Sequence, residues 1–259
     1  MSRIPALGLL LLSAATQATA AEHCEARSSA TITPLVELYT SEGCSSCPPA
    51  DRWFSKQIPD SQGNWLAFHV DYWDDIGWPD RFASHDYTLR QRARVLLSGG
   101  KDVIFTPQVM VGADVQAPWQ SSGRFERALK DASQPAPVAL ALQAQPQGKA
   151  WDVRLGVAHI AGSASIPAEV WLAQYIDGQV SHVRAGENRG VTLHHDRVVR
   201  KLYGPWKLGA ESLSQSVVVT PQVGSWGMTA FVQDGSGKIL QSLSLPAAAT
   251  CAPTGTASL

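Results

Sequence analysis

The 259-residue sequence has little that suits a nucleic-acid-binding or membrane-spanning protein. Its 21 Lys and Arg residues nearly balance 22 Asp and Glu residues, which gives a formal net charge of -1. A chain without excess positive charge lacks the field that attracts nucleic acids and anionic membranes. It also has no apolar run of about 20 residues, the length that a spanning helix needs. We therefore expect neither a nucleic-acid partner nor a membrane anchor in the mature chain.

Cysteine is scarce as well, with only Cys24, Cys44, Cys47 and Cys251 in the whole chain. Zinc sites of the knuckle or finger type require two further ligands beside a C-x-x-C pair. The sequence has no second C-x-x-C and no pair of histidines three to five residues apart. We therefore expect no bound metal and no cofactor beyond the dithiol of Cys44 and Cys47.

The first 21 residues have the pattern of a secretory signal peptide. Arg3 precedes an apolar run from Ile4 to Ala15, and small residues follow at positions 18–21. Cleavage there predicts a periplasmic or secreted protein, in a compartment where disulfides persist. A structural disulfide between Cys24 and Cys251 would then join the two ends of the mature chain, and two unpaired thiols are the alternative.

The pattern of apolar residues changes at Pro135-Ala-Pro137, which indicates a domain boundary. Before it, the pattern predicts strands over 33–40, 65–70 and 103–112, and helices over 49–58, around Phe82–Leu96 and around Phe125–Ala132. After it, short strands without a helical period are predicted over 138–143, 151–158, 168–176, 179–185, 191–202, 214–220, 228–233 and 238–245. Asp177-Gly178 and residues 234–237 have the composition of hairpin turns between such strands.

These elements predict a two-domain protein. Residues 1–21 would be the signal peptide and 22–134 an α/β domain. Residues 135–250 would be an all-β sandwich of immunoglobulin-like type, and 251–259 a C-terminal tail.

The C-x-x-C pair follows a predicted strand and precedes a predicted helix. Cysteines at this position can take part in thiol–disulfide exchange. The positive end of a helix stabilises a thiolate and lowers its pKa. Cys44 would be the exposed nucleophile, and Cys47 would resolve the mixed disulfide. A static disulfide is the alternative.

Thr106-Pro107, at the start of a later strand, resembles the cis-proline segment of the thioredoxin superfamily. The resemblance implies that Thr106 and Pro107 face the cysteines and shape a substrate groove. It also implies that Glu37 takes the place of the buried acid that moves protons for the inner cysteine.

Four segments resemble a family of secreted bacterial proteins classed as a thioredoxin-like domain of unknown function. They are residues 36–51, 69–74, 105–108 and 186–190. The resemblance covers nearly the whole mature chain. It implies a thioredoxin-like domain with a β-rich extension in a Gram-negative periplasm, and it implies no substrate.

Aromatic residues cluster after the second predicted strand, at the sheet edge where α/β folds bind ligands. Tyr72, Trp73 and Trp78 are either a binding wall for an apolar or peptide partner or a cap on the core. His69 is expected to be a structural histidine. Residues 186–190 are expected to form a surface turn. His194 and His195, adjacent in a predicted strand, should point to opposite faces.

The sequence thus predicts a thiol–disulfide oxidoreductase that exchanges disulfides with protein or small-molecule thiols. Two alternatives remain open. The reduced cysteines would bind a soft metal such as Cu(I), or a permanent disulfide would stabilise a non-catalytic interaction scaffold.

Overall fold

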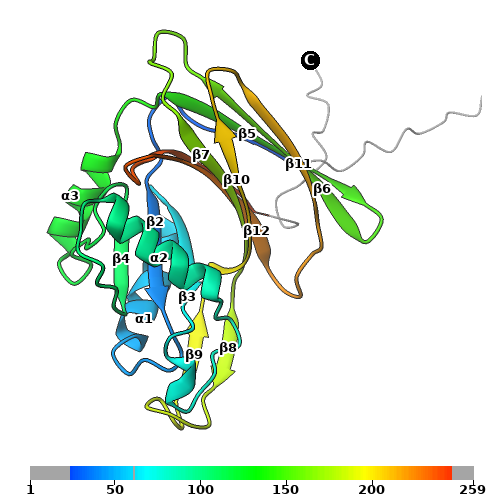
Figure 1. Ribbon diagram of the computed structural model, residues 1–259. Coiled ribbons are helices and arrows are strands. Elements are labelled where there is room, and N and C mark those ends of the chain that lie inside the picture. The colour runs from blue at the N-terminus through cyan, green and yellow to red at the C-terminus, as the bar shows by residue number, and fades with distance from the viewer. Residues whose placement is uncertain (1–23, 61, 247–259) are drawn as a thin grey trace, which may run out of the picture.

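The computed structural model describes residues 24–60 and 62–246 (Figure 1). Within these ranges the chain forms the helices α1 (Pro48–Gln57), α2 (His85–Leu97) and α3 (Ser122–Ala132). Its strands are β1 (Cys24–Arg27), β2 (Leu35–Thr40), β3 (Asn64–His69), β4 (Gln108–Val111), β5 (Val138–Gln147), β6 (Ala150–His159), β7 (Ala168–Ile176), β8 (Gln179–His182), β9 (Thr192–His195), β10 (Val198–Leu208), β11 (Leu213–Val219), β12 (Trp226–Asp234) and β13 (Ile239–Pro246). The predicted signal peptide lies outside the described residues.

A seven-stranded sheet in the order β13-β12-β7-β10-β3-β2-β4 runs through the middle of the molecule. Strands β2 and β3 are parallel, and β4 pairs antiparallel with β2. Strand β10 joins the free edge of β3 in parallel, with Val198 opposite Ala67. The sheet therefore crosses the boundary that the sequence predicts between residues 134 and 135.

The predicted fold class, an α/β thioredoxin-like domain followed by a separate immunoglobulin-like sandwich, is wrong. The described residues are mostly strand, and strands from both halves of the chain form one sheet. The physical reason lies at β3, because its edge would carry unpaired backbone groups in a domain that ended at residue 134. Strand β10 pairs with that edge.

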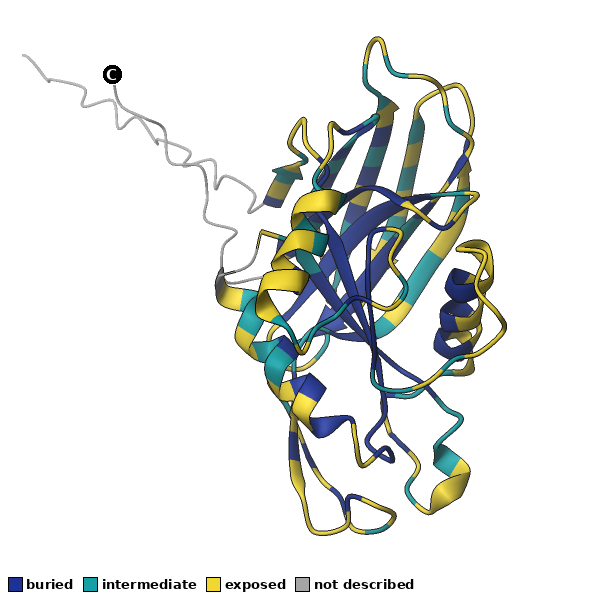
Figure 2. Cartoon of the chain, turned by 90° about the vertical axis from the view of Figure 1, so that its left-hand side faces the viewer, coloured by how far each residue is buried: buried dark blue, intermediate teal, exposed yellow. Residues whose placement is uncertain are grey.

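Each face of the large sheet has its own cover, as Figures 1 and 2 show. Helices α1 and α3 pack on one face of β2, β3 and β4, through a cluster that includes Phe54, Trp65 and Phe125. Helix α2 packs on the opposite face, where Tyr87 and Val95 join a cluster with residues of β2, β3, β7 and β12. Strand β12 is consequently buried on both faces.

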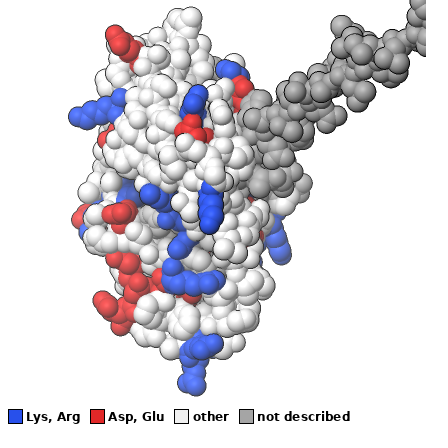
Figure 3. Space-filling view, turned by 90° about the vertical axis from the view of Figure 1, so that its right-hand side faces the viewer, with Lys and Arg blue, Asp and Glu red and all other residues white. Residues whose placement is uncertain are grey.

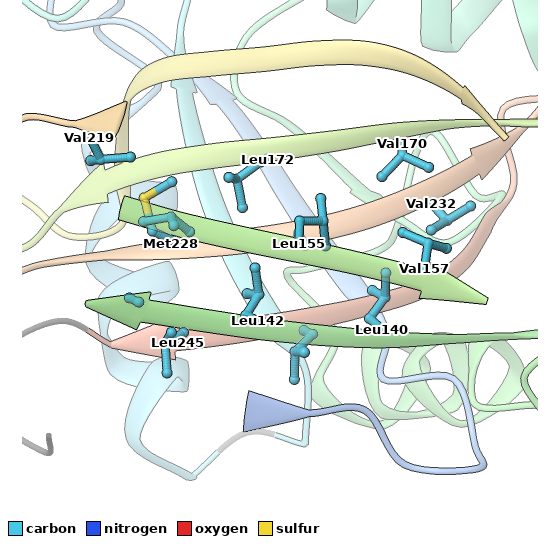
Figure 4. Close-up of a cluster of buried hydrophobic side chains, with 14 of the residues drawn as sticks. Leu140, Leu142, Leu155, Val157, Val170, Leu172, Val219, Met228, Val232 and Leu245 are labelled. Atoms are coloured by element: carbon cyan, nitrogen blue, oxygen red, sulfur yellow. The ribbon is translucent and has the colours of Figure 1, made fainter. Parts of the chain in front are cut away.

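The second layer is a four-stranded sheet in the order β1-β5-β6-β11. Its apolar side chains meet those of β7, β12 and β13 in the largest core (Figure 4), which includes Leu140, Leu142, Leu155, Val157, Val170, Leu172, Met228, Val232 and Leu245. Alternating burial along β5 places one of its faces in this core. The two sheets thus pack as a sandwich at this end of the molecule.

Strands β8 and β9 form a separate two-stranded ribbon at the opposite end of the molecule, where β9 packs against α1 (Figure 1). Asp177-Gly178 leads from β7 into this ribbon, so its predicted role as a hairpin turn is wrong. Residues 234–237 do form the predicted hairpin, between the antiparallel strands β12 and β13. The ribbon thereby brings residues of the second half to the N-terminal end of α1.

Acidic and basic side chains lie among a mostly uncharged surface on the face that Figure 3 shows. Among the described residues, none of the helices has the length and apolar character to cross a membrane.

Candidate redox site

Cys44 and Cys47 form a disulfide in the turn between β2 and α1, with their Cα atoms 5.4 Å apart. The backbone N–H of Cys47 donates to the Cys44 carbonyl at 3.2 Å, which closes the turn. Cys47 is the N-cap of α1. Pro48 and Pro49 follow in the first helical turn, where a missing N–H is tolerated.

Both cysteines are completely buried, at 0% exposure, whereas Ser45 and Ser46 between them are exposed. The expectation that Cys44 is exposed is therefore wrong for the disulfide form. The helix start also has few free donors for a thiolate. The two prolines have no N–H, and the N–H groups of Ala50 and Asp51 donate to the Cys47 carbonyl at 2.9 and 3.1 Å.

Thr106 and Pro107 lie beside this turn, and the bond between them is cis, as the resemblance implies. They lie there because β4 runs antiparallel to β2. Gln108, the first residue of β4, therefore pairs with Tyr39 near the end of β2. The Ser46 hydroxyl donates to the Thr106 carbonyl at 3.4 Å. An open groove here is lined by Ser46, Pro49, Phe105, Pro107, Val109 and Trp119, among others.

The three aromatic residues of the candidate binding wall are half-buried, and each donates a hydrogen bond within the protein. Trp73 Nε1 donates to Thr106 Oγ1 at 2.8 Å, and Trp78 Nε1 donates to Glu42 Oε2 at 2.8 Å. The Tyr72 hydroxyl donates to Gln91 Oε1 at 3.4 Å, and burial raises the pKa of Tyr72 to about 12. Trp73 and Trp78 therefore support loops beside the disulfide, whereas Tyr72 is bonded to helix α2.

Glu37 is not brought to the cysteines, which corrects its expected role as their proton carrier. Side chains alternate along β2, so Thr40 faces α1 whereas Glu37 faces α2. There Arg90 Nη2 donates to Glu37 Oε1 at 2.6 Å and Arg94 Nε donates to Oε2 at 3.0 Å. Burial opposes ionisation, but the two arginines outweigh it and lower the pKa of Glu37.

A buried cluster of acids and histidines lies on the α1 side instead. His69 Nδ1 is 2.6 Å from Asp80 Oδ2, and both side chains are fully buried. Burial alone would lower the pKa of His69, but Asp80 and the other nearby carboxylates outweigh it and raise that pKa. The ring of His195 crosses the ring of His69 edge to face, with centroids 4.9 Å apart.

His195 lies between two acids that flank the disulfide in sequence. Its Nε2 is 3.4 Å from Oε1 of Glu42, two residues before Cys44, and its Nδ1 is 4.0 Å from Oδ1 of Asp51, four residues after Cys47. Neither ring nitrogen completes a hydrogen bond, although both are buried. Burial raises the pKa of Asp51, and the two histidines offset this only in part.

The turn at residues 186–190 covers the same loop, and we call it the covering turn. Asn188 is buried, and its Nδ2 donates to the carbonyls of Glu42 at 2.8 Å and Cys44 at 2.9 Å. The N–H of Ser45 donates to Glu187 Oε2 at 3.1 Å. A segment expected to be a plain surface turn therefore binds the backbone of the C-x-x-C loop.

His194 and His195 point to opposite faces of β9, as predicted, with His194 exposed and His195 buried. The structural assignment of His69 fits its bond to Asp80. Cys24 is buried in β1, but Cys251 lies outside the described residues, so their pairing stays a prediction. Nowhere in residues 24–60 and 62–246 do three or more His, Cys, Asp or Glu side chains converge to hold a metal ion.

Comparisons with known proteins find similar folds and one family model. No curated protein matches the chain. The fold is similar to the crystal structure of protein AGR_C_4864 from Agrobacterium tumefaciens, with a TM-score of 0.59 and 24% identity over 86% of this chain and 98% of that chain. It is also similar to HBP35 of Porphyromonas gingivalis, with a TM-score of 0.63 and 14% identity over 89% of this chain and 80% of that chain. The family model described as "Protein of unknown function (DUF1223)" matches residues 35–233, and the chain therefore belongs to this family.

Proposed function

We propose that the protein is a thiol–disulfide oxidoreductase that exchanges disulfides with protein or small-molecule thiols through Cys44 and Cys47. The observation that carries this proposal is the position of the disulfide. It lies at the start of α1, beside a groove that Thr106 and Pro107 line. The motifs of this site resemble those of thioredoxin-like proteins. Because both cysteines are buried in the disulfide form, the turn must open before a partner in the groove can reach them.

The proposed exchange has two steps, in which Cys44 Sγ binds the substrate and Cys47 Sγ is the leaving group. A substrate thiolate attacks Cys44 Sγ, the bond between the cysteines breaks, and its electron pair stays on Cys47 Sγ, which takes up a proton. A second thiol of the substrate then loses its proton and attacks the substrate sulfur bound to Cys44. The substrate leaves as a disulfide, and Cys44 becomes a thiol. The reverse sequence reduces a substrate disulfide.

We also propose that this chemistry takes place in the periplasm or outside the cell, where a dithiol can be reoxidised. The signal-like residues 1–21 support this location. Cell fractionation of the full chain, with antibody detection of the shortened mature form, tests it, and a protein found unshortened in the cytoplasm would contradict it.

A redox titration tests the activity. We equilibrate the folded mature protein in buffers of reduced and oxidised dithiothreitol or glutathione, alkylate it and measure the mass. Static structural disulfides have potentials below about -300 mV, whereas exchange-active pairs have higher ones. We expect a potential above this value. A lower potential would favour the scaffold alternative.

A trapping experiment tests the roles of the cysteines. In Cys47→Ala the mixed disulfide on Cys44 has no resolving thiol, so partners should accumulate on this variant, with Cys44→Ala as the matched control. Adducts that form equally on the two variants, or on neither, would contradict the assigned roles. Titration of the reduced wild type with Cu(I) measures the metal-binding alternative directly.

A further inference from the structure

We propose that the substrates of this site are protein segments in which apolar residues flank the cysteine, and that Phe105 selects them. The surface that binds these flanking residues is the groove beside the disulfide, which we call the exchange groove. This inference rests on the proposed function and narrows it, because that function includes both protein thiols and small-molecule thiols such as glutathione.

The exchange groove comes within one side chain of Cys44. Ser46 lines the groove, and its Oγ is 3.3 Å from Cys44 Sγ and 3.4 Å from the Thr106 carbonyl oxygen. The Ser46 hydroxyl thus contacts both the sulfur and the residue that precedes the cis-proline. Once the turn opens, a substrate sulfur that reaches Cys44 past Ser46 has its neighbouring residues in the groove.

The lining of the exchange groove favours an uncharged occupant. Among the residues of the described ranges that line it, none is charged, and most are apolar or aromatic. Phe105 is 41% exposed in this lining. Covering such a ring with an apolar side chain removes apolar surface from water, which is favourable. A charged side chain in the same place loses hydration and gains no partner.

The apolar surface of the groove is fixed before a substrate binds. Gln91 Nε2 donates to the Phe105 carbonyl at 2.8 Å, which holds the backbone of this segment against α2. The ring of Trp119, also in the lining, packs against the ring of Trp53 with centroids 5.5 Å apart. A surface held in place in this way loses little conformational entropy on binding, so the apolar contact contributes more of its energy to affinity.

The exposed part of the C-x-x-C turn adds a charge argument against acidic substrates. Glu187 is exposed and accepts a hydrogen bond from the Ser45 N–H at 3.1 Å. Hydrogen bonds from Ser45 lower the pKa of Glu187, so its carboxylate is ionised at neutral pH. Glutathione has two carboxylates, and like charges brought together disfavour a partner. The groove and the turn therefore both favour a neutral, apolar segment.

In the test reaction, a disulfide oxidises the reduced protein. The Cys44 thiolate attacks one sulfur of that disulfide, and the other half leaves as a thiolate that takes up a proton. The Cys47 thiol then loses its proton, and its sulfur attacks Cys44 Sγ and releases the second half as a thiol. One disulfide is reduced and one is formed, so no further oxidant is needed.

The test compares four oxidants. Three are disulfide dimers of end-blocked peptides that contain Leu-Cys-Leu, Ser-Cys-Ser or Asp-Cys-Asp, and the fourth is glutathione disulfide. The rate of protein oxidation is measured by alkylation and mass, and is divided by the rate at which dithiothreitol reduces the same disulfide. This division removes differences in intrinsic reactivity. We expect the leucine peptide to react about tenfold faster than the serine peptide, which corresponds to about 1.4 kcal/mol. The aspartate peptide and glutathione disulfide should be slower still.

Variants then locate this preference on Phe105. Phe105→Ser should bring the leucine peptide close to the rate of the serine peptide, whereas Phe105→Leu should keep the preference. Val103→Ser is the matched control, because Val103 is 61% exposed on the same segment and does not line the groove. This control should keep the wild-type preference. Thermal unfolding shows whether each variant is folded.

The inference is overturned if the four corrected rates are equal, if glutathione disulfide is preferred, or if folded Phe105→Ser keeps the preference of the wild type. The comparison of the four disulfides uses the wild-type chain, so it decides the substrate class even if Phe105→Ser fails to fold. A folded, reduced protein that none of the disulfides oxidises would overturn the proposed function and this inference with it. Exchange without preference would overturn the inference alone, so the two failures are distinguishable.

Discussion

At the scale of single residues, Glu37 shows how a buried acid can serve the fold and not the chemistry. Its carboxylate lies between Arg90 and Arg94, and the Arg90 guanidinium also lies 4.7 Å from the ring centroid of Phe231. Removing one partner of a buried ion pair costs about 3–5 kcal/mol, because the other charge stays buried. We expect Glu37→Gln to lower the free energy of unfolding by about this amount in urea at pH 7.

The pH dependence of this effect has a definite sign. The native pKa of Glu37 is lowered from 4.5, so its stabilising contribution is complete above that pH and is lost as the pH falls through the native pKa. The difference between Glu37→Gln and wild type should therefore shrink in acid. A variant with unchanged stability but slow thiol exchange would instead restore Glu37 as a proton carrier.

The residues of the site differ in how far the sequence reveals them. Spacing identifies Cys44 and Cys47, and the resemblance to the thioredoxin superfamily identifies Pro107. Glu37 is misassigned because side chains alternate between the two faces of a strand, and the resemblance does not specify which face Glu37 takes. Asp51 could have been predicted as a neighbour of Cys47, because it follows Cys47 by four residues on a predicted helix and residues with this spacing share a helix face. No sequence pattern predicts the contact of Asn188 with Cys44, because 144 positions separate the two residues.

At the scale of elements, we expect the covering turn to limit access to the disulfide, because it binds the backbone of the C-x-x-C loop. Asn188→Ala removes both side-chain hydrogen bonds to the carbonyls of Glu42 and Cys44. A hydrogen bond contributes about 0.5–1.5 kcal/mol, so we expect dithiothreitol to reduce the pair about tenfold faster in this variant. The measurement is the rate of alkylation after a pulse of dithiothreitol. Arg189→Ala, at the exposed neighbouring position, is the control and should react like wild type.

A wild-type rate in Asn188→Ala would show that the covering turn does not shield Cys44. A rate that rises equally in both variants would attribute the effect to general loosening of the turn.

Element positions were largely predictable, and their assembly was not. Apolar periodicity places helix α1 and strands β2, β3 and β7 within two residues of their observed ends. The predicted strand 191–202, however, is split into β9 and β10, which join different sheets. The break is at Arg197, whose φ of 55° is in the left-handed region. Without a glycine or proline at this position, the sequence pattern gives no sign of it.

At the scale of the whole molecule, the continuous sheet predicts that the halves do not fold separately. A fragment of residues 22–134 would lack β10 at the edge of β3 and the β7 and β12 side chains that pack with α2. We expect this fragment to be unfolded or insoluble. The mature chain should unfold in one transition, with the same midpoint by circular dichroism and by tryptophan fluorescence. Two transitions, or a folded fragment with native-like spectra, would show that the halves are independent.

The distance along the chain between the cysteines and the covering turn also sets an order of events during biosynthesis. The ribosome completes Cys44 and Cys47 long before Asn188 and His195, so a growing chain presents an unshielded dithiol. Contacts between such distant segments form late, because the intervening loop must first be closed. An unfinished chain therefore exposes its C-x-x-C pair more than a finished one, in which Asn188 binds the loop that leads into Cys44. The reactivity of this pair thus reports whether synthesis and folding have reached the end of the chain.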